Sequence, residues 1–136
     1  MHSNAILATQ IFPGIDSEKR VLLIVDDDPQ VRKTLVRLLG REFDETRVAA
    51  NSDEAETQLA DGMVRFLICD FSLGGRQPKG TELIRRWRRQ HPSLQRTVLF
   101  SGSYINDIDI PREVDQLVCK SEDPAMLLRA LQAPAE

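Results

Sequence analysis

Charged and hydroxyl side chains directly follow four apolar runs of this sequence. Three consecutive aspartates, Asp26–Asp28, come after VLLIV, and Asp70 comes after FLIC. Ser101 follows VLF, and Lys120 follows LVC. Carboxylates crowded at one place repel one another unless a cation lies among them, and hard oxygen ligands favour Mg²⁺. If the fold brings these residues together, they predict a magnesium site with a lysine that neutralises phosphoryl charge.

Each of these residues also has an ordinary structural explanation. Asp28 is a suitable helix cap, and Asp70 can simply open a loop. Ser101 can begin a turn, and Lys120 can be a solvated residue at the end of a strand. The functional interpretation therefore depends on whether the fold brings them to one place.

The apolar runs alternate with stretches of helical periodicity, and this alternation predicts an α/β fold. We expect strands at residues 21–25, 46–49, 65–69, 97–100 and 116–119. We expect helices from Pro29 to Gly40, from the Asn51 cap to Leu59, from near Thr81, and after Pro124. The stretch 104–110 mixes Asn, Asp and Ile ahead of a proline, so the fourth helix should be short or irregular.

Connections long enough for a helix, with right-handed crossovers, make the five strands parallel. The carboxyl ends of parallel strands then share one edge of the sheet, where open α/β sheets bind their ligands. All the residues that follow the apolar runs therefore collect at this edge. The predicted architecture is a doubly wound, five-stranded parallel sheet.

Four segments of the chain, VLLIVDDDPQVR, FLICDFSL, VLFSGS and LVCK, resemble the receiver domain of two-component response regulators. The resemblance covers about residues 19–133 and implies the flavodoxin-like strand order 2-1-3-4-5. It implies that Asp70 accepts a phosphoryl group from a histidine kinase or a histidine phosphotransfer protein. Ser101 and Lys120 would then contact the phosphoryl oxygens.

The resemblance also implies the ligands of a Mg²⁺ ion. Asp27 would bind the metal directly and Asp26 would bind it through water. Asp70 and the backbone carbonyl of Ser72 would complete the protein ligands. The resemblance further implies a domain that accepts and slowly loses a phosphoryl group and is not a turnover enzyme.

The sequence departs from the usual receiver pattern in the loops. Gly74 stands where a proline is usual, and Gly80 follows the acceptor by ten residues instead of eight, so this loop is about two residues longer. Ser121 replaces the proline that normally follows the lysine. Leu117 stands where an aromatic switch side chain is usual, so we expect residues 102–110 to carry the conformational response instead.

Composition limits the possible partners. The chain has 136 residues with a net charge of −3, which predicts one domain and disfavours direct nucleic-acid binding. The run Val21–Val25 is far too short to cross a membrane, and the first residues do not resemble a secretory signal, so we expect a cytoplasmic protein. We expect a flexible leader at 1–18, the domain at 19–133 and a tail at 134–136, with no residues left for an output domain.

Two further features of the sequence have structural interpretations. Cys69 and Cys119 each end an apolar run, which predicts buried thiols instead of a disulfide or a zinc site. The arginines around Trp87 predict a solvated helix face behind a tryptophan that faces the core.

Several interpretations stay open. The alternatives are a receiver-like binding module that is not phosphorylated and the receiver piece of a hybrid histidine kinase. A third alternative is a Mg²⁺-dependent phosphatase with an aspartyl nucleophile. Such an enzyme usually needs a second aspartate two residues after the nucleophile, and Ser72 at that position disfavours this alternative. In the leading interpretation the signal passes to a downstream protein target that the sequence does not identify.

Overall fold

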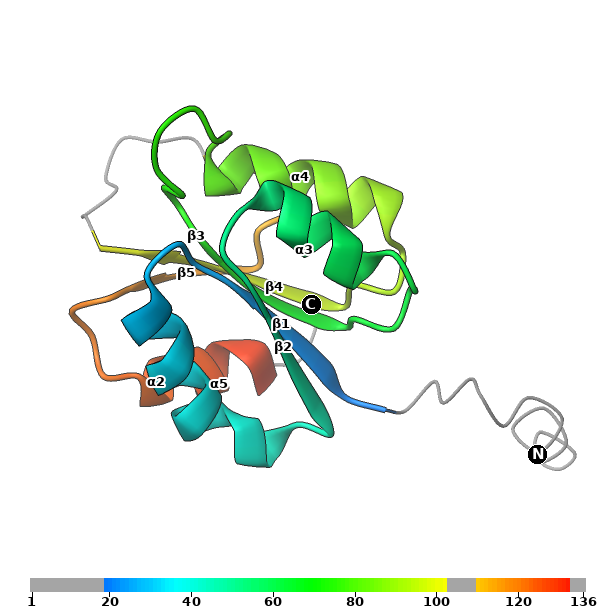
Figure 1. Ribbon diagram of the computed structural model, residues 1–136. Helices are drawn as coiled ribbons and strands as arrows, with labels where there is room; N and C mark the ends of the chain where they lie inside the picture. Colours follow the sequence, from blue (N-terminus) through cyan, green and yellow to red (C-terminus); the bar gives the residue numbers. More distant parts are fainter. Residues whose placement is uncertain (1–18, 103–109, 133–136) are drawn as a thin grey trace, which may run out of the picture.

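A computed structural model describes residues 19–102 and 110–132 of the chain. Five parallel strands form one sheet in the order β2-β1-β3-β4-β5, and α2 and α5 cover one face while α3 and α4 cover the other (Figure 1). The strands are β1 (Val21–Val25), β2 (Glu45–Ala49), β3 (Phe66–Asp70), β4 (Arg96–Ser101) and β5 (Gln116–Cys119). The helices are α2 (Pro29–Leu39), α3 (Ser52–Leu59), α4 (Gly80–Gln90) and α5 (Ala125–Gln132), with a short 3-10 turn, η1 (Gly40–Glu42), after α2. The predicted doubly wound, flavodoxin-like fold is confirmed.

Two of the strands extend one residue further at their carboxyl ends than the sequence predicts. Asp70 is the last residue of β3, where it is paired with Phe100, and Ser101 is the last residue of β4, where it is paired with Cys119. The ladder continues because Phe71 donates its amide hydrogen to Phe100 O at 3.1 Å. Both polar residues are therefore held by regular backbone pairing.

The helix starts follow the predicted capping chemistry. Pro29 is the first residue of α2, and Asp28 accepts a hydrogen bond from Gln30 N. At α3, the Asn51 side chain accepts from Glu54 N, and Glu54 Oε1 accepts from Ala50 N at 2.8 Å. Asp28 and Asn51 thus pair amides that lack partners in the first turn of each helix, and Glu54 pairs an amide just before α3.

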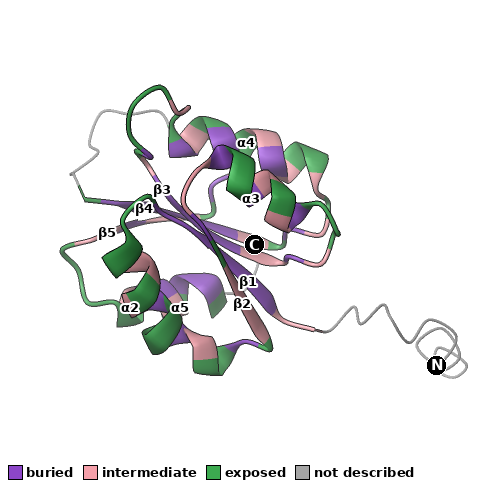
Figure 2. Cartoon of the chain, in the orientation of Figure 1, coloured by how far each residue is buried: buried purple, intermediate pink, exposed green. Residues whose placement is uncertain are grey.

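Alternate residues of the buried strands supply two cores, one on each face of the sheet (Figure 2). Leu22 and Ile24 of β1 pack beneath α2 and α5, whereas Val21, Leu23 and Val25 pack beneath α3 and α4. All five residues of β1 are fully buried, as expected of a central strand that is covered on both faces.

Trp87 of α4 faces the core, as predicted, and has no exposed surface. Its Nε1 donates a hydrogen bond to Glu56 Oε2 of α3 at 3.2 Å, so the indole also joins the two helices on this face. The neighbouring Arg88 is less solvated than predicted, because its guanidinium contacts Asp115 Oδ2 at 2.6 Å and Thr97 Oγ1 at 3.0 Å.

The two cysteines are free thiols. Cys69 of β3 is fully buried, as predicted. The prediction of a buried Cys119 is wrong: this residue ends β5, at the edge of the sheet, and its side chain is only partly covered. Its Sγ lies 3.2 Å from Ser121 Oγ.

Some expectations concern residues outside the described part of the chain. The predicted leader at 1–18, the tail at 134–136 and nearly all of the 102–110 stretch belong to this group. Within residues 19–102 and 110–132, no helix combines the length and the apolar character that crossing a membrane requires.

Candidate functional site

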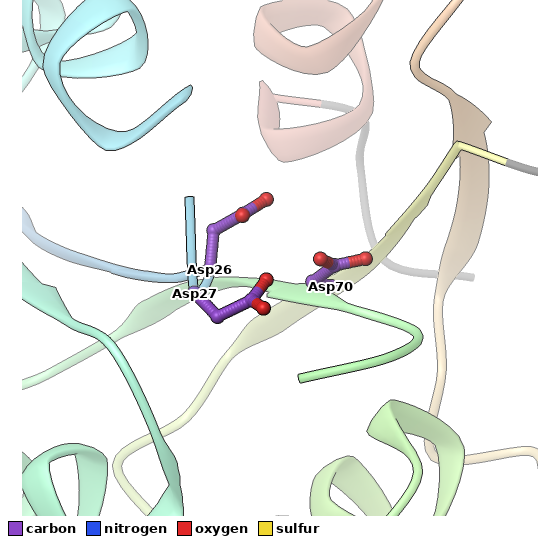
Figure 3. A group of neighbouring side chains, drawn as sticks. All are labelled: Asp26, Asp27 and Asp70. Carbon is purple, nitrogen blue, oxygen red and sulfur yellow. The ribbon is translucent and has the colours of Figure 1, made fainter. Parts of the chain in front are cut away.

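Three carboxylates meet at the carboxyl edge of the sheet (Figure 3). Asp26 and Asp27 follow β1, and Asp70 ends β3. The pairing of Val25 with Cys69 makes these two strand ends neighbours. One oxygen of each carboxylate lies within 4.8 Å of the others. The predicted acidic cluster is therefore present in the structure.

The three carboxylates differ in their environment. Asp26 is 1% exposed and Asp70 is 6% exposed, whereas Asp27 lies open to solvent. Asp26 Oδ1 accepts a hydrogen bond from Asp28 N at 2.9 Å. Asp26 Oδ2 is buried and faces the Lys120 ammonium group.

Lys120 reaches into the cluster from the end of β5. Its Nζ lies 2.8 Å from Asp26 Oδ2 and 3.1 Å from Asp70 Oδ2. The side chain crosses over β4, where its Nζ is 5.4 Å from the centre of the Phe100 ring. The backbone of Lys120 is fixed beside β4, because Lys120 N donates to Ser101 O at 2.7 Å. Lys120 therefore contacts both carboxylates although Ser121 follows it in place of the usual proline.

Burial and charge together determine the protonation of the site. Burial, and then the nearby charge of Asp26, raises the pKa of Asp70, and Lys120 offsets part of this effect. Burial alone would lower the pKa of Lys120, but its ion pairs with Asp26 and Asp70 outweigh burial and raise that pKa. Lys120 thus stays protonated at neutral pH, and one ammonium group faces three carboxylates. The excess negative charge favours binding of a divalent cation.

The hydroxyl and carbonyl groups predicted for the site come from β4 and from the loop after β3. Ser101 is 2% exposed, and the strand pairing of β3 with β4 places it beside the end of β3. Ser72 is exposed and lies two residues beyond Asp70, and its amide lies 3.4 Å from Asp70 Oδ1. The structure thus brings Asp26, Asp27, Asp70, Ser101 and Lys120 to one edge. A metal-binding role for the Ser72 carbonyl stays a prediction.

Two residues in this neighbourhood were not assigned a role from the sequence. Gly80 begins α4 against the end of β3, and a Cβ at this position would overlap Asp70 O. Gln77 lies in the loop between them, and its Oε1 accepts a hydrogen bond from Ser52 N at 2.9 Å. The spacing of the glycines indicates the close approach of Gly80 to Asp70. No sequence pattern indicates the hydrogen bond between Gln77 and Ser52.

Comparison with known proteins identifies the family of this chain. The family model for the response regulator receiver domain matches residues 22–132. The chain therefore belongs to the receiver domain family of two-component response regulators. In this family the domain signals by phosphorylation and the acidic pocket binds Mg²⁺.

Curated relatives and solved structures agree with this assignment. The transcriptional activator protein ExaE of Pseudomonas putida is 31% identical over 117 residues, covering 82% of this chain and 53% of ExaE. A response regulator from Burkholderia pseudomallei, solved with a phosphorylated aspartic acid, calcium ion and citrate, is 26% identical with a TM-score of 0.71. The match covers 85% of this chain and 68% of that one.

Response regulator protein TrrA from Thermotoga maritima, solved in complex with Mg²⁺ and BeF, is also similar. It is 26% identical with a TM-score of 0.68, and the match covers 81% of this chain and 94% of TrrA. By contrast, the chain spans about half of ExaE and less than a fifth of the nitrogen assimilation regulatory protein NtrX of Azorhizobium caulinodans, where the match covers 18%.

Proposed function

We propose that Asp70 is the phosphoryl acceptor of a two-component phosphorelay. The observation that carries this proposal is the position of Asp70 at the end of β3, with one ammonium group 3.1 Å from its Oδ2 and two further carboxylates beside it. An acceptor carboxylate needs cationic partners that stabilise the incoming phosphoryl oxygens.

The donor set of the site fits Mg²⁺. Asp26, Asp27 and Asp70 supply hard oxygen atoms, and the carbonyl of Ser72 would add a neutral one. The buried Oδ2 of Asp26 lies 2.8 Å from Lys120 Nζ, so a metal bound here would join an ion pair that the side chains already form. When bound, the metal neutralises charge on the phosphoryl group and on the carboxylates.

The chain's own residues then have distinct roles. An Asp70 carboxylate oxygen attacks phosphorus of the donor's phosphohistidine, and an aspartyl phosphate forms as the phosphorus–nitrogen bond breaks. The imidazole leaves with the bonding electron pair and takes up a proton. Lys120, already beside Asp70 Oδ2, pairs with one phosphoryl oxygen. The Ser101 hydroxyl donates a hydrogen bond to another.

The partners follow from this chemistry. The donor is a histidine kinase or a histidine phosphotransfer protein, and the phosphorylated domain acts through a protein contact. The net charge of −3 supports a protein partner over direct contact with nucleic acid. ExaE, which is a transcriptional activator by name, shows that a related domain belongs to a gene regulator.

Incubation with Mg²⁺ and acetyl phosphate, followed by intact mass spectrometry, tests the proposal. The wild type should gain one phosphoryl group, and Asp70→Asn should gain none. Asp28→Asn is the matched control, because it removes a carboxylate next to the site and asparagine caps a helix as well as aspartate does.

Two outcomes would contradict the assignment. Equal labelling of wild type and Asp70→Asn would place the phosphoryl group elsewhere. A wild-type chain that binds Mg²⁺ and is never labelled would instead favour a receiver-like module that acts by binding alone.

A further inference from the structure

The loop between β3 and α4, residues 71–79, begins beside the acidic cluster, where Ser72 lies next to Asp70 and Gly74 lies next to Asp27. Gly74 has a φ of +86° and Gly75 a φ of +50°, so the backbone turns sharply here. A Cβ built on Gly74 would lie 3.3 Å from Asp27 Oδ2. A side chain at this position would therefore press against a predicted metal ligand, which glycine avoids.

The base of this loop is held firmly. Gly80 N donates to Phe71 O at 2.7 Å, and Leu73 is 5% exposed in the core beneath α3 and α4. The outer limb from Gly74 to Lys79 has a different anchor. Gln77 N donates to Gly74 O at 3.1 Å, and the Gln77 side chain reaches α3.

The contact of Gln77 with α3 uses a backbone amide that the helix cannot pair itself. Ser52 is the first residue of α3, and its amide donates to Gln77 Oε1 at 2.9 Å. Because β2 lies beside β1 and leads directly into α3, this helix starts at the same edge of the sheet as the acidic cluster. The hydrogen bond ties a loop of the site to a rigid element.

We propose that Gln77 is a positioning residue for phosphorylation of Asp70. This inference rests on the proposed function of that residue. Gln77 holds the glycine-containing limb of the loop against the cluster, so that Gly74 keeps its place beside Asp27. The side chain itself touches neither metal nor phosphoryl group.

The physical reason is conformational entropy. The loop is about two residues longer than the usual receiver pattern and contains two adjacent glycines, both of which increase the number of conformations it can adopt. Without the Gln77 bond, Mg²⁺ binding must also order the outer limb of the loop, and the apparent affinity for the metal falls accordingly. A single hydrogen bond at the outer limb lowers that cost before the metal arrives.

Two substitutions remove opposite ends of the same hydrogen bond. Gln77→Leu removes the acceptor, and Ser52→Pro removes the donor at the first helical position, where proline is well tolerated. Asn51 has a φ of −156° and a ψ of 177°, an extended conformation that suits the residue before a proline. Gln77→Glu is the conservative control, because its carboxylate accepts the same bond at a helix start that favours negative charge.

The measurement is the Mg²⁺ concentration that gives the half-maximal initial rate of labelling by acetyl phosphate. We expect Gln77→Leu and Ser52→Pro each to raise this Mg²⁺ concentration several-fold. The labelling rate at saturating Mg²⁺ should stay close to that of the wild type. The double variant should resemble either single variant, and Gln77→Glu should resemble the wild type.

Three results would overturn the proposal. If both single variants melt at a lower temperature but keep the wild-type Mg²⁺ dependence, Gln77 only caps α3. If Gln77→Leu is impaired and Gln77→Glu is impaired equally, the accepted hydrogen bond is not the cause. If the wild type itself is never labelled, the proposed function of Asp70 fails first and the role of Gln77 fails with it.

Discussion

The acidic site is built in two different ways, from strand ends and from a loop. Asp26, Asp70 and Lys120 extend from β1, β3 and β5, whose backbones are fixed by parallel pairing along their whole length. The loop at 71–79 is held by its base, by buried Leu73 and by the side chain of Gln77. The first part is determined by the sheet, and the second by a few individual contacts.

This difference explains which departures from the receiver pattern the site tolerates. Ser121 follows the lysine in place of a proline, and Lys120 Nζ still reaches both Asp26 and Asp70. The loop after β3 accommodates its extra length through Gly74 and Gly75, and Gly80 still packs against the backbone of Asp70. The strand ends keep the charged groups in place, whereas the longer loop needs its own contacts to hold it.

The largest effect should come where the two parts meet, at Gly80. The added methyl of Gly80→Ala would overlap Asp70 O and lie 2.9 Å from Leu99 Cδ1. Because neither a strand backbone nor a packed core can move freely, we expect a loss of about 3 kcal/mol in the free energy of unfolding, measured by urea denaturation.

Gly40→Ala is the matched control for Gly80→Ala. Gly40 has a φ of −59°, and a Cβ there would be 3.8 Å from Thr46 Oγ1. We expect this variant to be neutral or slightly more stable than wild type. Equal stability of the Gly80 and Gly40 variants would show that the base of the loop moves independently of β3.

Removing the Lys120 ammonium group should have a smaller effect on the free energy of unfolding. Lys120→Met leaves Asp26 and Asp70 without their ammonium partner, and breaking a buried ion pair is costly. Since the lysine side chain is 24% exposed, we expect about 2 kcal/mol of destabilisation in EDTA, less than for a fully buried pair.

Mg²⁺ provides the internal check on the lysine variant. The metal should stabilise Lys120→Met more than it stabilises wild type, because it then replaces the charge of the missing ammonium group. Urea denaturation with and without Mg²⁺ measures both quantities. A variant as stable as wild type in EDTA would show that the ion pairs contribute nothing to the metal-free fold.

The smallest effect should come from the exposed carboxylate at the border with the loop. Asp27→Asn reduces repulsion within the cluster, and because Asp27 lies in solvent we expect a gain of only about 0.5 kcal/mol in EDTA. The same variant should lose most of the stabilisation by Mg²⁺. Loss of stability in EDTA would mean that repulsion does not dominate around Asp27.

The same contrast separates what the sequence predicts from what it does not. A buried strand has a continuous apolar pattern, so the pattern alone places the residues that follow VLLIV, FLIC, VLF and LVC at one edge of the sheet. The side chain of Gln77 reaches Ser52, 25 residues away, and no local pattern indicates such a contact. The partial exposure of Cys119 is not predictable from the sequence either, because an apolar run does not reveal that its strand lies at the edge of the sheet.

The single tryptophan has a practical consequence for all of these measurements. Trp87 is fully buried on the face formed by α3 and α4, and its indole nitrogen is hydrogen-bonded to Glu56 of α3. Intrinsic fluorescence excited at the indole band therefore comes from one place in the molecule, on α4 and in contact with the helix to which Gln77 is bound. Its emission wavelength will report movement of α3 against α4 without any added label, and its quenching will show when solvent reaches that layer.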